Sequence, residues 1–323
     1  MKIKAFAPGK VILFGEHSVV HNKPAIAVAI NRGVDVELIS REDKIVTINV
    51  PLIEYNKTHQ MDNKKLIFQL DSQNKMITDY IYEVMNLFEF EHGFDLTVDI
   101  KMYLGAGLGS SAAVTVSCLK AISLFTGCEM TKEEIAKQAR DIEIKIQGAA
   151  SPIDTSMSTY GGIIYIDEEF NLERIDFDMQ LPLIVSDCKK TGNTGKLVES
   201  VRQKYVKYPL IVGNIFNAMQ EVAKKAKTAL ESGDSELIGD LMNINQGLLD
   251  SIGVNTLELS DMVYLTRKYG AKGSKLTGSG GGGCIIAYCP DNIEEIYTQL
   301  KNKYPTFKCE QSDEGVQAEI IEN

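Results

Sequence analysis

The stretch that most constrains the fold is residues 104–117, LGAGLGSSAAVTVS, because it joins two segments of different periodicity. Residues 94–102 carry an apolar side chain at every second position, which predicts a half-buried strand. The small and apolar residues from Ser110 to Phe125 predict a helix. A glycine turn between a strand and a helix leaves backbone N–H groups at the helix start, where the helix dipole favours an anion. The stretch therefore suggests an anion-binding turn.

Neither of the two common nucleotide-binding loops is present at this stretch. A Rossmann turn needs G-x-G-x-x-G and a P-loop needs G-x-x-x-x-G-K-[ST], whereas Gly105, Gly107 and Gly109 simply alternate. A literal G-x-G-x-x-G string stands at 278–283, but it leads into the strand-like CIIAYC rather than a helix. Glycines let a ligand approach the backbone closely. From the residues alone, a phosphate-binding turn and an ordinary tight turn both remain open.

The length and the change of pattern along the chain predict two domains. The chain has 323 residues, which is more than one simple core usually holds. Helical periodicity dominates from residue 212, and a strand–glycine–strand unit at 275–289 interrupts it. We therefore expect one domain over residues 1–180 and a second over residues 181–323.

Shorter patterns predict individual elements. Residues 1–52 and 161–186 alternate apolar runs with turns, as is typical of strands. Thr131 and Glu134 have the spacing of a capping box and predict a helix start. The apolar face of that helix is Ile135, Ala139, Ile142 and Ile146. Residues 53–75 are polar and predict an excursion or a flexible loop.

The formal net charge of −10 limits the classes of ligand. Nucleic acids and anionic membranes bind to basic surfaces, so we expect neither as a partner. No apolar run reaches the roughly 18 residues of a membrane helix, and the first residues do not resemble a signal peptide. The six cysteines are scattered without a CxxC pair, which favours reduced thiols and a cytoplasmic protein. A bound polyanion would therefore need local positive groups or a divalent cation.

Five side chains are candidates for chemistry, and each has an ordinary alternative. Lys10 follows Ala-Pro-Gly and is either a solvated charge or a ligand contact. The adjacent Glu16 and His17 form a pair that is more often a surface feature than a site. Glu143 lies at the edge of an apolar helix face, either as a boundary residue or as a buried cation ligand. Asp154 follows a proline among small residues and is either an Asx-turn residue or a catalytic carboxylate.

Three motifs resemble those of the GHMP small-molecule kinases and follow that family's order. They are APGKVILFGEHSVVHNKPAIA at 7–27, LGAGLGSSAA at 104–113 and KLTGSGGGGCIIA at 275–287. Connecting segments also match, so the resemblance spans the chain; they lie at 143–162, 186–198 and 242–254. Within this superfamily, the G-E-H-x-V-V opening with P-A-I-A, together with N-Q-x-L-L, is similar to the mevalonate kinase family. The resemblance implies a two-domain α+β fold, with an N-terminal ribosomal protein S5-like domain and a C-terminal ferredoxin-like α/β domain.

The resemblance also implies an activity and roles for residues. The activity is phosphorylation of mevalonate at its 5-hydroxyl by ATP with Mg²⁺, a step of isoprenoid biosynthesis. Asp154 would accept the hydroxyl proton, while Lys10 would keep Asp154 ionised and stabilise charge near the γ-phosphate. Ser111 and Glu143 would hold Mg²⁺. The ATP phosphates would contact Gly105, Ala106, Gly107, Leu108, Gly109, Ser110 and Ser111, and the mevalonate pocket would be lined by Glu16, His17, Thr194, Gly280 and Gly281.

Two other functions remain open at this stage: a phosphomevalonate kinase, and a catalytically silent sensor with the same fold. One departure from the family concerns the substrate carboxylate. Gly192 stands where animal mevalonate kinases carry a basic residue, and Lys189 or Lys190 is the candidate to replace it. The resemblance further implies a homodimer as the assembly.

Overall fold

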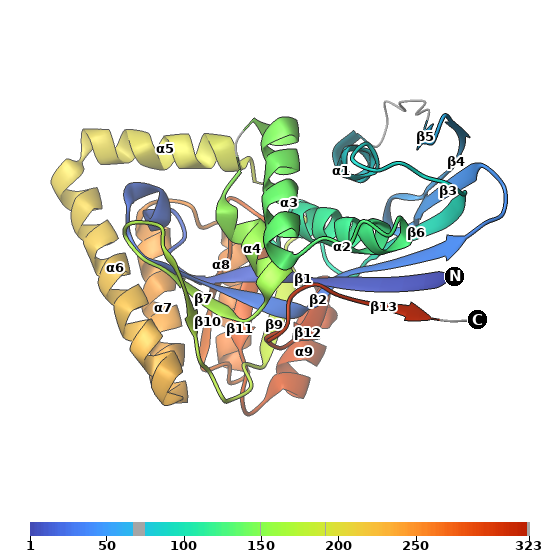
Figure 1. Ribbon diagram of the computed structural model, residues 1–323. Coiled ribbons are helices and arrows are strands. Elements are labelled where there is room, and N and C mark those ends of the chain that lie inside the picture. The colour runs from blue at the N-terminus through green and yellow to red at the C-terminus, as the bar shows by residue number, and fades with distance from the viewer. Residues whose placement is uncertain (67–74, 149, 191, 322–323) are drawn as a thin grey trace.

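The computed structural model describes residues 1–66, 75–148, 150–190 and 192–321, which form two β-sheets with helices packed on them (Figure 1). Among these residues the larger sheet has the strand order β13-β1-β2-β6-β3-β4-β5, and β7 pairs with both β2 and β8. All pairs in it are antiparallel except β3 with β6. Its strands are β1 (Lys2–Phe14), β2 (Ala25–Ser40), β3 (Ile45–Val50), β4 (Tyr55–Asp62), β5 (Lys65–Leu66), β6 (Phe94–Ile100), β7 (Ile163–Ile166), β8 (Leu172–Ile175) and β13 (Gln317–Ile321).

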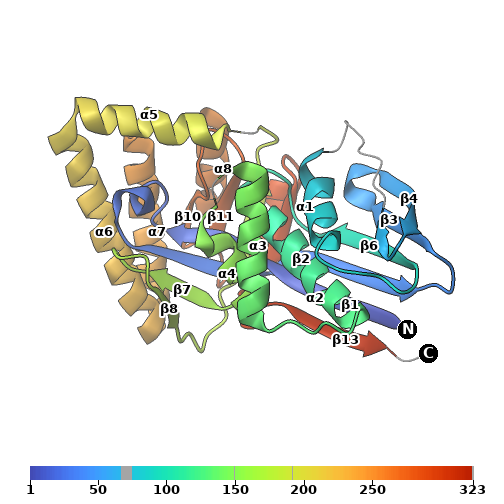
Figure 2. The same ribbon diagram turned by 45° about the horizontal axis from the view of Figure 1, so that its top comes forward.

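Helix α2 is the centre of the first core. It packs on β1 and β2, and the other three helices of this part pack against it in turn. Its side chains from Ala112 to Leu119 are all buried, as is typical of a helix enclosed by other elements, and the hydroxyls of Thr115 and Ser117 donate to carbonyls of the same helix. Figure 2 shows α3 crossing the middle of the molecule in front of the large sheet. The helices are α1 (Lys75–Met85), α2 (Ser110–Phe125), α3 (Lys132–Gln147) and α4 (Pro152–Tyr160).

The smaller sheet has the order β10-β11-β9-β12 and is entirely antiparallel. Its strands are β9 (Leu183–Asp187), β10 (Gly273–Leu276), β11 (Cys284–Tyr288) and β12 (Thr306–Cys309). The accompanying helices are α5 (Thr194–Lys207), α6 (Pro209–Ser232), α7 (Ser235–Ser251), α8 (Leu257–Lys268) and α9 (Ile293–Lys301). Two 3₁₀ turns lie in the first half of the chain, η1 (Ser18–His21) and η2 (Pro51–Ile53). None of the described helices is long and apolar enough to cross a membrane.

Side-chain amides of α7 cover the outer edge of β10. The backbone N–H of Ser274 donates to Oδ1 of Asn243 at 3.1 Å, and that of Leu276 donates to Oε1 of Gln246 at 2.8 Å. An edge strand exposes alternate N–H groups, and buried N–H groups need partners. Helix α7 therefore fixes the position of β10 through directional hydrogen bonds as well as apolar packing.

The last described strand returns to the first sheet. Strand β13 pairs antiparallel with β1, from Lys2 opposite Ile321 to Phe6 opposite Gln317. The start of β1 and the end of β13 consequently lie side by side (Figure 1). Strand β8 ends at Ile175 in the large sheet and β9 begins at Leu183 in the small one. The boundary placed near residue 180 falls between them and stays a prediction.

Most of the predicted elements are present. The α+β class, the strand starting at Phe94, the helix over Ser110–Phe125 and the capping box at Thr131 are confirmed. The loop predicted over 53–75 is wrong in part, because Tyr55–Asp62 forms β4 and pairs with β3. Most residues of this strand are polar and exposed, and its buried side chains are Tyr55 and His59, which lie on the same face. Residues 67–74 of that prediction lie outside the described ranges.

Candidate active site

The glycine turn after β6 has the backbone geometry of a ligand cradle. Gly105, Gly107 and Gly109 have φ of 67°, 76° and 70°, values that residues with a Cβ rarely adopt. Gly105 and Gly107 are exposed, whereas Leu108 is buried and fixes the turn to the core. Gly109 is the N-cap of α2, and no side chain caps that helix start. The first N–H groups of α2 are thus available to an anion.

Lys10 and Asp154 face each other across β1 and α4. The Nζ of Lys10 lies 3.1 Å from Oδ1 of Asp154, and their side chains are 7% and 33% exposed. A register shift at Pro8/Gly9 interrupts the pairing of β1 with β2 just before Lys10. The hydroxyl of Ser158, one turn after Asp154 on α4, donates to the carbonyl of Pro8 at 2.9 Å. This bulge and its hydrogen bond set the direction in which Lys10 points.

Ser111 and Glu143 meet beside the same turn. The Ser111 hydroxyl donates to Oε1 of Glu143 at 2.8 Å, from the first turn of α2 to the last third of α3. Burial raises the pKa of Glu143 to about 7, the charge of Asp154 adds to this, and the Ser111 hydrogen bond and Lys10 oppose it. A carboxylate in such surroundings is poorly compensated. A cation placed here would restore its ionised form.

The donor set fits Mg²⁺ only together with a phosphate. Within the described ranges, no group of three or more His, Cys, Asp or Glu residues is placed to hold a metal ion. Mg²⁺ prefers oxygen ligands and is usually held by one or two protein groups plus phosphates and water. The Ser111 hydroxyl and the Glu143 carboxylate, at the start of an anion-binding helix, match this pattern.

His17 and Thr194 are brought together by Ser279. The His17 Nε2 lies 2.8 Å from the carbonyl oxygen of Ser279, and the Thr194 Oγ1 lies 3.0 Å from the Ser279 Oγ. Ser279 belongs to the glycine-rich segment between β10 and β11, and the sequence patterns had not indicated a binding role for it. Desolvation lowers the pKa of His17, opposed by the Ser279 carbonyl and by Glu16. His17 is therefore a neutral hydrogen-bonding group at pH 7.

Glu16, next to His17 in the chain, is buried in an internal ion pair. Its side chain is 1% exposed and forms an ion pair with Lys275, whose side chain is fully buried. The second carboxylate oxygen accepts from Asn245 Nδ2 at 3.2 Å. Both oxygens are bound to protein groups and hidden from solvent, so Glu16 acts on its surroundings through Lys275 and Asn245, and its place in the mevalonate pocket stays a prediction. The sequence patterns gave Lys275 no role. Its position within a predicted strand was the signal that its side chain could be buried.

The glycine run 278–283 packs on protein backbone. A Cβ at Gly280 would lie 2.3 Å from the carbonyl oxygen of Val254, and the N–H of Gly281 donates to that same oxygen at 2.7 Å. At the start of the run, a Cβ on Gly107 would lie 3.4 Å from the Cα of Gly278. The run thus touches the exposed glycine turn. A substrate contact by Gly280 and Gly281 stays a prediction.

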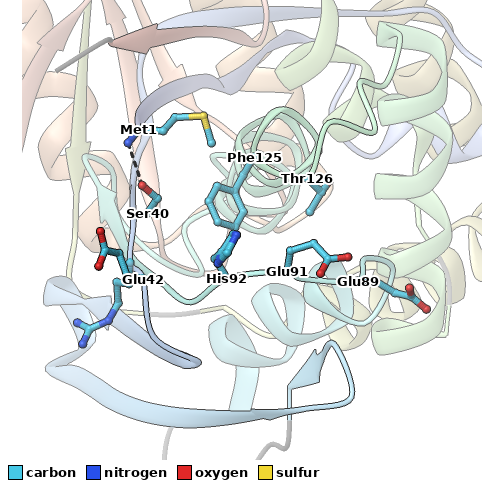
Figure 3. A pocket seen from close by; sticks show the side chains of 9 residues that line it. Met1, Ser40, Glu42, Glu89, Glu91, His92, Phe125 and Thr126 are labelled. Carbon is cyan, nitrogen blue, oxygen red and sulfur yellow. Dashed lines mark hydrogen bonds between the residues drawn. The ribbon is translucent and has the colours of Figure 1, made fainter.

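A separate cavity of about 390 Å³ lies away from these residues. Its lining includes Met1, Ser40, Glu89, His92 and Phe125, and Figure 3 shows the Met1 ammonium donating to the Ser40 hydroxyl. None of the candidate residues contributes to it. The candidate site is therefore defined by polar groups that converge on it and not by the size of a cavity.

Comparison with known families identifies the class of the chain. Residues 79–162 match the model of the GHMP kinases N terminal domain, and residues 226–306 match that of the GHMP kinases C terminal domain. The first match contains the glycine turn, Glu143 and Asp154, and the second contains Lys275 and the glycine run. The fold and the site thus define a GHMP small-molecule kinase.

Individual relatives narrow this class. The chain is 38% identical to the mevalonate kinase of Methanothermobacter thermautotrophicus, over 98% of this chain and 100% of the relative. It is 42% identical to the mevalonate kinase of Pyrococcus furiosus, over 93% of each chain. A crystal structure of L. major mevalonate kinase in complex with R-mevalonate matches with a TM-score of 0.80 and 25% identity, over 96% of this chain and 95% of that one. The chain belongs to the mevalonate kinase family.

Proposed function

We propose that the protein transfers the γ-phosphoryl group of ATP to the 5-hydroxyl of (R)-mevalonate. The observation that carries this proposal is the convergence of the Lys10–Asp154 pair and the Ser111–Glu143 pair at the start of α2. One pair offers a carboxylate base beside a cation, and the other offers hard oxygen ligands beside an anion cradle. A hydroxyl acceptor and a phosphate donor both find complementary groups within this one site.

The chain's residues would act mainly through position and charge. Backbone N–H groups of the turn from Gly105 to Ser111 would bind the phosphate oxygens. Asp154 would take the proton from the substrate hydroxyl as the new P–O bond forms and the bond to the β-phosphate oxygen breaks. Lys10 would stabilise the charge that gathers between the attacking oxygen and the γ-phosphate. Because Lys10 is only 7% exposed through its side chain, little water would screen that interaction.

Mg²⁺ would be held by Ser111 and Glu143 together with the phosphates. When bound, it would neutralise phosphate charge in the way that metal ions do in phosphoryl transfer. The raised pKa of Glu143 supports this role, since Lys10 and the Ser111 hydrogen bond offset the burial of its carboxylate only in part. On the mevalonate side, His17 and Thr194 would line the pocket, because both reach Ser279 at the edge of the glycine run.

A coupled assay of ADP release tests the proposal with four acceptors: mevalonate, phosphomevalonate, homoserine and galactose. We expect turnover with mevalonate alone. Turnover with phosphomevalonate and not mevalonate would assign the protein to the next kinase reaction. Nucleotide binding without turnover of any acceptor would favour the silent sensor.

We further propose that the protein is a cytoplasmic homodimer. All six cysteines are free thiols and five are buried, as suits a reducing compartment. At the junction of α5 and α6, Val206, Leu210 and Ile211 are 71%, 82% and 64% exposed, and such apolar groupings favour association. Light scattering of the purified protein should give twice the mass of the 35.7 kDa chain. A monomeric mass would contradict the assembly alone.

A further inference from the structure

The Glu16–Lys275 ion pair joins the two sheets inside the protein. Glu16 follows β1 of the large sheet, and Lys275 lies on β10 of the small sheet. The Lys275 ammonium also donates to the carbonyl of Leu276 at 2.7 Å. Asn245 of α7 donates to the carboxylate oxygen of Glu16 that Lys275 does not contact. A buried ion pair commonly stabilises a protein no better than apolar groups of the same size. A role in fixing geometry is therefore the better explanation for its presence.

The geometry next to this pair is strained. His17 has φ 61° and ψ −41°, and the N–H of Ser18 donates to the carbonyl of Glu16 at 2.7 Å. Together these define a γ-turn with positive φ at its central residue, a rare and strained conformation. Strain of this kind persists only where the surroundings hold the backbone on both sides. Such conformations gather at functional sites.

Two contacts hold the turn at its ends. The Glu16 side chain is held by Lys275 and Asn245, and the His17 ring is held by the Ser279 carbonyl. Lys275 and Ser279 are four residues apart on one segment, so both contacts attach the turn to the same part of the chain. Between them, the Thr277 hydroxyl donates to the Ile12 carbonyl at 3.1 Å and accepts from the Ile12 N–H at 3.0 Å. The segment and the end of β1 are therefore joined at three successive points.

We propose that Lys275 is a positioning residue for the substrate pocket: by holding Glu16, it maintains the strained turn that directs His17 onto Ser279. The inference rests on the proposed function, in which His17 and Thr194 meet mevalonate beside Ser279. Lys275 has no access to solvent and contacts neither reactant itself. Its effect on mevalonate passes through the turn, while the ATP cradle at Gly105–Ser111 meets this segment through Gly107 and Gly278 and not through Lys275 or Glu16.

The test compares two double variants by steady-state kinetics and by NMR titration of the His17 ring. Lys275→Met alone would leave a buried carboxylate without its partner, so the main variant is Glu16→Gln with Lys275→Met, which removes both charges. The control is Glu236→Gln with Lys272→Met. It removes an exposed ion pair of 2.6 Å between α7 and the residue before β10. The His17 signal is assigned by its absence from the spectrum of His17→Asn.

For the Glu16/Lys275 variant we expect the KM for mevalonate to rise about tenfold or more, with the KM for ATP within about twofold of the original. The pKa of His17 should move up toward 6.5 if its ring leaves the buried contact, because desolvation is the largest cause of its lowering. A fall in this pKa, the effect of losing the Glu16 charge while the ring stays buried, would overturn the proposal. The control should change neither quantity. An unchanged KM for mevalonate with an unchanged His17 titration would overturn the proposal. So would an equal rise of both KM values, since that would indicate a general loss of structure.

The titration needs no substrate and separates the two proposals. If the original protein does not phosphorylate mevalonate, the proposed function fails. The His17 ring still reports whether Lys275 holds the turn, and an unaltered titration would then overturn the positioning role by itself. A variant that does not fold is replaced by Glu16→Gln with Lys275→Leu, which also removes both charges and leaves the hydrogen bond from Asn245 possible, with the same expected shift and the same contrary result.

Discussion

The Nζ of Lys10 lies 3.1 Å from Oδ1 of Asp154, and this pair joins the first strand of the chain to the first turn of α4. The two residues are 144 positions apart, so the contact exists only in the folded protein. The Ser158–Pro8 hydrogen bond holds the same helix to the same strand one turn further on. The pair is thus fixed by structure on both sides, and its function can be tested by substitution.

Replacement of Asp154 by Asn should lower kcat by about 10²- to 10⁴-fold, because a general base that acts in the transition state is lost. The KM values for ATP and mevalonate should change little, since a group of this kind contributes to kcat more than to ground-state binding. The measurement is steady-state kinetics with each substrate varied. Asp141→Asn, at an exposed position of α3, is the matched control. Unaltered kcat in Asp154→Asn would remove the base from the mechanism and leave the fold assignment intact.

Replacement of Lys10 by Met should also lower kcat, and the loss in the double variant with Asp154→Asn should be much smaller than the product of the two losses. Residues that act as a unit are not additive. The acid limb of the rate profile should move to higher pH in Lys10→Met, because a carboxylate without a neighbouring cation is protonated more easily. Multiplicative losses with no change in the pH profile would leave Lys10 as a phosphate contact only.

Ser111→Ala and Glu143→Gln should each lower turnover and raise the Mg²⁺ concentration needed for half-maximal activity. The reason is that each variant removes one of the two protein oxygens proposed to hold the ion. A titration of activity against free Mg²⁺ at fixed ATP measures this. Asp141→Asn again serves as the control on α3. If both variants keep the original Mg²⁺ requirement, Glu143 is a buried boundary residue of its helix.

Alanine at His17 or at Thr194 should raise the KM for mevalonate several-fold and leave the KM for ATP nearly unchanged. Both side chains reach Ser279 and come from motifs outside the ATP cradle. A loss of one hydrogen-bonding group commonly reduces binding by about tenfold. Kinetics with each substrate varied in turn provide the check. The reverse pattern, a raised KM for ATP alone, would assign these residues to the nucleotide.

The stability of the ligand-free protein should depend on His17 below pH 6.5. Burial lowers the pKa of His17, with Glu16 and the Ser279 carbonyl opposing that shift, and His21 lies close enough to interact electrostatically. Below pH 6.5 the unfolded chain therefore binds the proton more readily than the folded one. The free energy of unfolding should fall with decreasing pH, by at most about 1.4 kcal/mol per pH unit from this residue.

Urea unfolding at pH values from 7.5 to about 5 measures this slope. His17→Asn should flatten it, while His92→Asn, at an exposed position, should leave it as in the original protein. Equal slopes in the original protein and His17→Asn would show that the ring titrates alike in the folded and unfolded chains.

Local sequence patterns predicted much of the fold, but they could not predict polar contacts between residues that are far apart in the sequence. Helix α2 and the capping box of α3 are present because their signals lie within one turn of the chain. The pairing of Glu16 with Lys275 joins residues 259 positions apart, and nothing in either neighbourhood indicates the other. Family resemblance supplied candidate roles for Lys10 and Asp154. It could not show that the Glu16 carboxylate faces the interior, since that depends on where β10 lies against β1.

The return of β13 to β1 has a consequence for how the protein is made. Strand β1 leaves the ribosome well before its outer partner β13, which spans Gln317–Ile321. Until β13 is made, β1 has an open edge, and open edges invite pairing with other chains. Completion of the large sheet therefore waits for the synthesis of β13, and a chain that ends before Gln317 would be prone to aggregate.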